Sequence, residues 1–188
     1  SADRDTLIRR AYMDLIGMPP TVDQWLRWRE DTDPNWFANL VDHLLASPHY
    51  GERWGRYWLD LAGYADSEGG ISAAPVRPLA WKYRDYVIRS LNADKPFDRF
   101  IHEQLAGDEM VTSPASNLSP DDVELLTATG FLRMAPDGTG GSVPDAQVAR
   151  NETIADTIKI VTSSLMGMTV GCAQCHDHRY DPISQADY

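Results

Sequence analysis

The sequence predicts a mainly α-helical protein that forms a single domain. Two observations lead to this prediction. Apolar residues recur at helical spacing along most of the 188 residues, whereas the alternating pattern of a strand never extends beyond about four residues. The chain is 43% hydrophobic and 24% charged, so it can bury a core and lacks the composition of a disordered chain. We expect about seven to nine helices, joined by long loops rich in glycine and proline, over residues 1–188.

The first part of the chain contains helix signals separated by proline or glycine. An apolar stripe from Leu7 to Ile16 predicts the first helix, and Gly17 is expected to end it. Further helices are predicted where an N-cap residue or a first-turn proline precedes an apolar stripe. These starts are Thr21 with Gln24 in the capping-box position, Asp33-Pro34 and Ser47-Pro48.

The helical pattern stops between residues 67 and 78, which predicts a long loop, and resumes over residues 81–91 and 97–105. Gly107 is predicted to end the second of these helices. Ser119-Pro120 and Asp145 are predicted to begin the last two helices, with a flexible loop over residues 135–144 between them. The residues expected in the core include Trp54, Trp58 and Trp81, and Val148, Ile154, Ile158, Val161 and Leu165 on the last helix.

The net charge of −11 and the pI near 4.7 limit the classes of partner. An acidic surface repels nucleic-acid phosphates and anionic lipid, so neither is expected to bind. The same charge suits a basic protein partner. No apolar run approaches the roughly 18 residues that a membrane span needs.

The two cysteines are the most informative residues of the chain. Cys172 and Cys175 are followed directly by His176, in the C-x-x-C-H spacing of c-type haem attachment. The two thiols can form thioethers with the porphyrin vinyl groups, and the next residue places an imidazole under the iron. A thioredoxin-like pair would need a βαβ context, and a zinc site would need two more ligands. We therefore expect one covalent haem c near the C-terminus, with His176 as its proximal iron ligand.

Longer segments of the sequence resemble a known family. The matching segments are RRAYMDLIGMPP (9–20), LLASPHYGERW (44–54), WLDL (58–61), YADS (64–67), WKYRDYVI (81–88), EQLAGD (103–108), ATGFLR (128–133) and CAQCHDHRYDPI (172–183). On these segments the chain is similar to the planctomycete cytochrome c-like family, a domain of unknown function in large exported proteins, over nearly its whole length. The resemblance implies a periplasmic or otherwise extracytoplasmic haem domain within a longer polypeptide that carries further domains. It implies no particular reaction.

The second axial ligand is not defined by the sequence. Many family members have His where this chain has Tyr57, so we expect Tyr57 near an iron face that is open, water-bound or weakly ligated. His178 is joined to His176 by at most about 7 Å of extended chain, which cannot pass around the porphyrin edge. We expect His178 to bond a propionate, orient His176 or cap the following turn, and we group Arg179 with it as cofactor-binding. Other candidates for the distal ligand are His49, His102, Met134, Met166 and Met168.

Two classes of function remain open. Electron transfer to a redox partner protein is favoured, and an oxidative or peroxidatic haem enzyme with an open distal iron site is the alternative. A structural or sensory haem module is a third class, so the sequence does not decide whether the protein is an enzyme. Acidic residues that could bind calcium, supply general acid–base pairs or form a solvated face are Asp60, Asp66, Glu68, Asp85 and Asp108.

Overall fold

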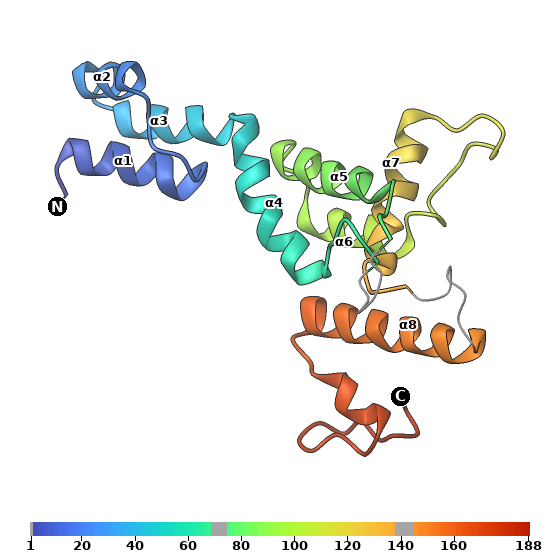
Figure 1. Cartoon of the computed structure of the whole chain (residues 1–188). Coiled ribbons are helices and arrows are strands. Elements are labelled where there is room, and N and C mark those ends of the chain that lie inside the picture. Colours follow the sequence, from blue (N-terminus) through green and yellow to red (C-terminus); the bar gives the residue numbers. More distant parts are fainter. Residues whose placement is uncertain (1, 69–74, 138–144) are drawn as a thin grey trace. The chain divides into compact units, whose positions relative to one another are not determined.

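The computed structural model describes residues 2–68, 75–137 and 145–188 (Figure 1). These residues form eight α-helices and no strand, apart from an isolated bridge between Ser67 and Val76. The predicted mainly helical fold is confirmed. None of the helices in the described residues combines the length and the apolar character that crossing a membrane requires.

Contacts divide the chain into two compact units. The first consists of residues 1–58 and 87–96, and the second of residues 59–86 and 97–188. Helices α4 (Pro48–Ala62) and α5 (Ala80–Asn92) each contribute residues to both units. We predicted a single domain that unfolds in one transition, and this stays a prediction.

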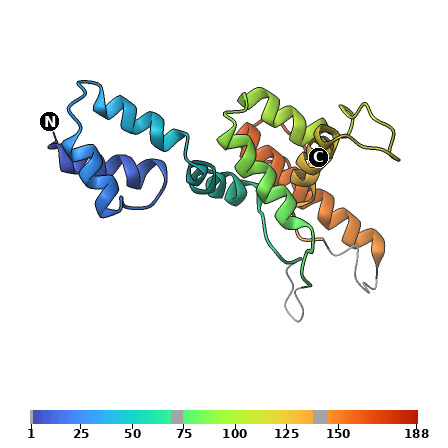
Figure 2. The same ribbon diagram turned by 90° about the horizontal axis from the view of Figure 1, so that it is seen from above.

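In the first unit, α1 (Arg4–Leu15) packs against α2 (Val22–Glu30) and α3 (Trp36–Leu45), as Figures 1 and 2 show. The guanidinium of Arg4 joins α1 to the end of α2, since it donates to the carbonyl oxygens of Trp28 at 2.9 Å and Asp31 at 2.6 Å. The helices enclose one apolar cluster, formed by Ile8, Ala11, Tyr12, Ile16, Trp28, Leu40 and Leu44.

Local capping explains where the first helices begin. Thr21 and Gln24 form both bonds of the predicted capping box at the start of α2. The prediction that Asp33-Pro34 begins the third helix is wrong by about two residues. The Asp33 carboxylate accepts from the Asn35 amide at 2.7 Å, which forms a turn, and α3 starts only at Trp36.

Helix α4 begins at Pro48 as predicted, and Trp58, one of its predicted core residues, is half-buried. Trp54 is 40% exposed, and so the prediction that it lies in the core is wrong. The buried positions of α4 that contact α5 are instead the small residues Gly51 and Gly55. Trp81, 47% exposed at the start of α5, is a second such error.

In the second unit, α6 (Phe97–Ala106) packs against α7 (Pro120–Ala128) and the 3₁₀ helix η1 (Thr129–Arg133). Two buried hydrogen bonds join the α5 residues of this unit to α6. The Tyr86 hydroxyl donates to Glu103 Oε2 at 2.9 Å, and the Tyr83 hydroxyl donates to Gln104 Oε1 at 2.6 Å. The Ser119 side chain caps α7 as predicted.

Gly107 follows α6 for a different reason from the one predicted. Its backbone is not in the left-handed region, so it is not a left-handed helix stop. A Cβ at this position would overlap the carbonyl oxygens of Leu125 and Glu103. Gly107 is therefore needed for the close approach of two backbone segments.

Helix α8 (Ala146–Val161) starts at the predicted N-cap, where the Asp145 carboxylate accepts from the Gln147 and Val148 amides. The predicted buried face of this helix is wrong in part. Val148 is 51% exposed and Ile154 is 47% exposed. The buried positions of α8 are instead the smaller residues Ala149 and Thr153, which allow close packing on the rest of the second unit.

Candidate functional site

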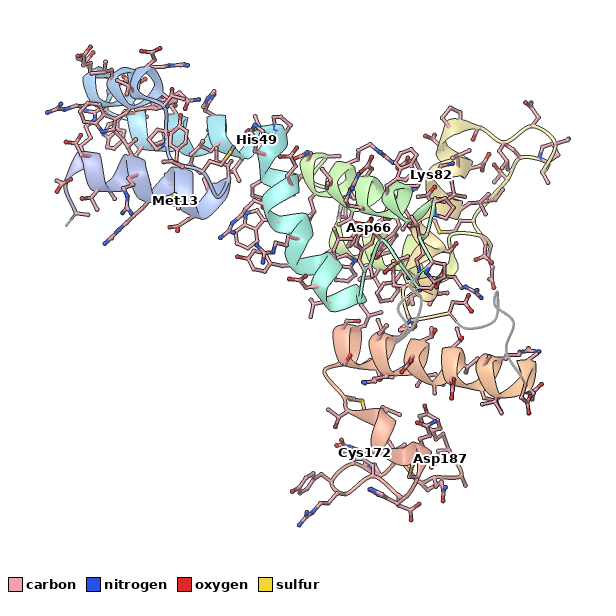
Figure 3. All side chains as sticks on the ribbon, viewed as in Figure 1. Met13, His49, Asp66, Lys82, Cys172 and Asp187 are labelled. Atoms are coloured by element: carbon pink, nitrogen blue, oxygen red, sulfur yellow. The ribbon has the colours of Figure 1, made fainter. Side chains whose placement is uncertain are left out.

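The segment after α8 carries the cysteine–histidine motif (Figure 3). Helix α8 continues into a π-turn, Thr162–Met166, which ends at Gly167 with a left-handed backbone of φ 65° and ψ 22°. A short 3₁₀ helix, η4 (Val170–Gln174), follows and packs against α8. The chain reversal at Gly167 thus brings the motif back alongside the helix that precedes it.

The motif forms a single helical turn. The Cys172 carbonyl accepts from the Cys175 amide at 3.3 Å and from the His176 amide at 3.4 Å. The second cysteine and the histidine are therefore held about one turn beyond the first cysteine. Both thiols are free and exposed, whereas Ala173 between them is fully buried and anchors the turn.

The His176 ring is exposed, and one hydrogen bond defines its tautomer. Nδ1 lies 2.8 Å from the carbonyl oxygen of Asp177, which can only accept. Nδ1 therefore carries a proton, and in the neutral ring Nε2 carries the lone pair that can bind a metal. This is the arrangement of a metal-binding histidine, in which the second nitrogen donates to a backbone carbonyl.

His178 has a different role from His176. Its side chain is only 5% exposed. Its Nδ1 accepts from the Asp181 amide at 2.9 Å and the Tyr180 amide at 3.3 Å, and its Nε2 lies 3.3 Å from Thr169 Oγ1. The ring thus caps the turn after the motif, one of the three roles predicted. A contact of His178 with haem stays a prediction.

Further polar contacts fold the last residues back onto the motif. Asp177 Oδ1 accepts from the Gln185 amide at 2.8 Å. Asp187, labelled in Figure 3, accepts from the Ser184 hydroxyl at 2.7 Å and amide at 2.9 Å, and these bonds lower the pKa of Asp187. Burial raises the pKa of the Tyr188 phenol, and the charges of Asp156 and Cys175 raise it further.

A cavity of about 400 Å³ lies between α8 and the motif turn. Cys172 and Met168 line one side, and Asp156 and Lys159 of α8 line the other. Its size is within the range of small-molecule and cofactor pockets. Asp156 and Lys159 were not among the predicted site residues, because the close approach of α8 to the motif leaves no local signal in the sequence.

These observations test whether the residues fit a haem. They fit, since the chain offers two free exposed thiols, an imidazole with a free Nε2 and a neighbouring cavity. In the part of the chain that the structure describes, no three His, Cys, Asp or Glu side chains are grouped to hold a metal ion. A haem does not need such a group from the protein, because the porphyrin supplies the equatorial ligands.

The comparison with protein families gives a match over residues 1–188 to PSCyt2, described as a protein of unknown function (DUF1549). The chain belongs to this family. The match agrees with the resemblance to a planctomycete cytochrome c-like domain. No curated protein and no solved structure matches the chain.

In this PSCyt2 chain, Tyr57 belongs to the first unit and the motif to the second. Tyr57 is 46% exposed, with its ring 5.6 Å from that of Trp54 and the Arg53 guanidinium 5.3 Å above it. Its proximity to the iron stays a prediction. Arg179 is exposed and lies over the ring of Tyr180 at 5.5 Å, so its guanidinium is accessible to a cofactor or partner.

The other candidates for the distal ligand have local environments of their own. His49 Nδ1 lies 2.7 Å from Glu52 Oε2, and His102 Nδ1 lies 3.1 Å from the Asp98 carbonyl. Met134 is 5% exposed and packs in the core, whereas Met166 is 62% exposed and Met168 lines the cavity at Cys172. No second ligand is defined by these contacts.

Three of the five acidic residues considered for calcium have protein partners. The Tyr64 hydroxyl donates to Asp66 at 2.7 Å, and burial together with this carboxylate raises the pKa of Tyr64 to about 12. Asp85 pairs with Arg84 at 2.9 Å, and Glu68 with Arg77 at 2.7 Å. These contacts give the calcium prediction no support among the described residues.

Proposed function

We propose that this PSCyt2 chain is an extracytoplasmic mono-haem cytochrome c domain that transfers electrons. One observation carries the proposal: two free exposed thiols and a histidine with a free Nε2 lie on a single helical turn. A haem bound there supplies one-electron redox chemistry. Its location in the periplasm or another extracytoplasmic compartment rests on the family resemblance.

The roles of the residues follow from their contacts. Cys172 and Cys175 would hold a haem through thioether bonds, for which each thiol S–H would add across one vinyl double bond, with the sulfur on one carbon and the hydrogen on the other. His176 would supply Nε2 to the iron, and the Asp177 carbonyl would hold the proton on Nδ1. His178 keeps the following turn in place and so limits the positions that the His176 backbone can adopt.

The net charge of the chain indicates the kind of redox partner. The net charge of −11 favours association with a basic redox protein at low ionic strength. Further domains of the same polypeptide are the other partners that the family resemblance implies.

A haem enzyme with an open distal face is the second candidate, and one observation favours it. Both ring nitrogens of His178 are engaged within the turn, so this histidine is not free to ligate iron. We therefore propose that the distal face is open, water-bound or weakly ligated, with Tyr57 near it.

The test of covalent attachment begins with the chain produced together with a cytochrome c maturation system. Acid–organic extraction should leave the haem on the denatured protein, and the pyridine haemochrome spectrum should have the thioether form. Replacing both Cys172 and Cys175 with Ala should abolish this retention. Haem that extracts completely from the wild-type chain contradicts the proposal.

The axial ligands are tested by spectroscopy of matched histidine variants. His176→Ala should retain the thioethers but change the iron spectrum, whereas His43→Ala, which removes an exposed ring beside Trp28 that is not a candidate ligand, should not. Carbon monoxide and imidazole should bind readily if the distal face is open. A bis-histidine low-spin signal that disappears in His102→Ala or His49→Ala would refute the open face and favour electron transfer.

A further inference from the structure

A second cavity, of about 430 Å³, lies in the second unit at the N-terminus of α5. It shares no lining residue with the cavity at Cys172. Its walls are mostly apolar, and they come from the residues before α5, from α7 and from the segment of η1. Leu79 is 62% exposed and Leu126 is 39% exposed, although both line this cavity. Large apolar side chains exposed around a concave surface are typical of a binding site.

One wall of the cavity contains a buried arginine. The side chain of Arg77 is 7% exposed. Its guanidinium donates to Glu68 Oε2 at 2.7 Å and to the carbonyl oxygens of Met134 at 2.9 Å and Ala135 at 2.5 Å. Its Nε is also buried but has no hydrogen-bond acceptor among the described residues. A buried donor without an acceptor is unusual in a folded protein, and the side chain that carries it lines this cavity.

The charge of the lining differs from that of the whole chain. Arg77, Lys82 and Arg133 supply three positive charges, and Glu68 and Asp137 supply two negative charges, so the lining carries +1 while the chain carries −11. Helix α5 begins at the cavity, so the partial positive charge at its N-terminus adds to the positive charge of the lining. A locally positive cavity on an acidic protein favours an anion.

We propose that this cavity binds a small amphipathic carboxylate, such as an alkyl carboxylate. The carboxylate lies at the polar wall, beside Arg77 and Lys82, and the apolar chain lies between Leu79 and Leu126. Binding is non-covalent and is independent of the proposed haem, because the two sites share no residue.

The binding test uses two probes with the same alkyl chain and opposite charge. Isothermal titration calorimetry of the full chain with decanoate should give one saturable site, and decyltrimethylammonium should bind at least about tenfold more weakly. The absence of saturable decanoate binding overturns the proposal. Equal affinity for the two probes overturns it as well, because the site would then recognise only the apolar chain.

Two pairs of variants locate the site. Leu126→Arg should abolish decanoate binding, whereas Leu105→Arg, at a residue that is 40% exposed on α6 and does not line the cavity, should not. Lys82→Glu should weaken binding by about tenfold or more, whereas Arg150→Glu, the same charge change at an exposed position of α8, should leave it unchanged. Unchanged binding in both Leu126→Arg and Lys82→Glu refutes the site.

Circular dichroism must accompany these titrations, since Leu126→Arg could unfold the second unit. In that event Lys82→Glu, which changes only an exposed side chain, decides between the outcomes. Amide chemical-shift changes induced by decanoate locate the binding site independently of the variants. They should concentrate on residues 77–83 and 126–137, and a set confined to other residues contradicts the proposal.

Discussion

The apolar cluster of the first unit and the C-terminal segment, residues 162–188, are stabilised in different ways. The cluster consists of seven buried apolar residues, which lie on α1, α2 and α3 or, for Ile16, directly after α1. In the C-terminal segment, which the structure describes in full, Ala173 is the only buried apolar residue. Its shape depends on side chains that accept backbone hydrogen bonds, chiefly Asp177, His178 and Asp187.

This difference shows which part of the molecule depends on a cofactor under the proposed function. Burial of apolar surface stabilises the first unit without any ligand. A segment with almost no core gains little from burial, and its polar contacts each contribute only about 0.5–1.5 kcal/mol. A covalently attached haem would supply the apolar surface that the segment lacks.

The largest expected effect is in the apolar cluster, where two adjacent leucines of α3 differ in burial. Leu44 is 1% exposed and Leu45 is 41% exposed. Leu44→Ala should lower the free energy of unfolding by about 2–5 kcal/mol, because it removes a buried side chain and leaves a cavity. Leu45→Ala should cost less than about 1 kcal/mol. Urea unfolding followed by circular dichroism measures both, and similar losses would contradict the burial of this cluster.

The next effect distinguishes the two histidines of the C-terminal segment. His178→Ala leaves the Tyr180 and Asp181 amides without their acceptor, so the local structure should lose about 1–3 kcal/mol. In the haem-free chain, His176→Ala should change stability by less than about 0.5 kcal/mol, since its ring is exposed. Amide hydrogen exchange over residues 177–183 provides the measurement. Equal exchange rates in the two variants would show that His178 does not hold the turn.

A smaller effect is expected at the chain reversal before the motif. Gly167 has a φ of +65°, which an L-residue adopts only with strain, so Gly167→Ala should cost about 1 kcal/mol. Gly171→Ala is the control, because the backbone there is not left-handed and the new Cβ would lie 3.9 Å from Lys159 Cγ. This change should stay within about 0.5 kcal/mol. Thermal unfolding of both variants measures the difference, and a neutral Gly167→Ala would be inconsistent with the left-handed turn.

The smallest effect concerns the pH dependence of the C-terminal segment. Bonds from Ser184 lower the pKa of Asp187 in the folded protein. Because the folded pKa is lower than the unfolded value of about 4, protonation favours unfolding. The stabilisation is therefore present above about pH 4 and is lost as the pH falls through the folded pKa. Ser184→Ala should bring the NMR-measured pKa of Asp187 closer to its usual value. An Asp187 pKa at or above that value in the wild-type chain would rule out this contribution.

Much of the fold could be predicted because its signals are local. The capping boxes at Thr21 and Ser119 join residues three positions apart, so the sequence contains both partners. The start of α4 at Pro48 follows from the restricted backbone of proline. The error at Asp33 is also local, since its side chain could cap either a turn or a helix and here forms the turn.

Burial was predicted less well than helix position. Helical periodicity identifies the apolar faces of a helix but not which of them another element will cover. Trp54 remains exposed, whereas the small residues Gly51 and Gly55 of the same helix are the ones that α5 covers. On α8, small residues are buried in place of the larger Val148 and Ile154 for a similar reason.

The sequence by itself determined the helical class and the C-x-x-C-H spacing of the candidate haem site, because both depend on residues close together along the chain. Only the tertiary structure decided that His178 caps a turn, that α8 forms one wall of the cavity at Cys172 and that Arg77 is buried beside a second cavity. These features join elements that are distant in sequence, and their free energy comes from packing and buried hydrogen bonds that form only when the units fold.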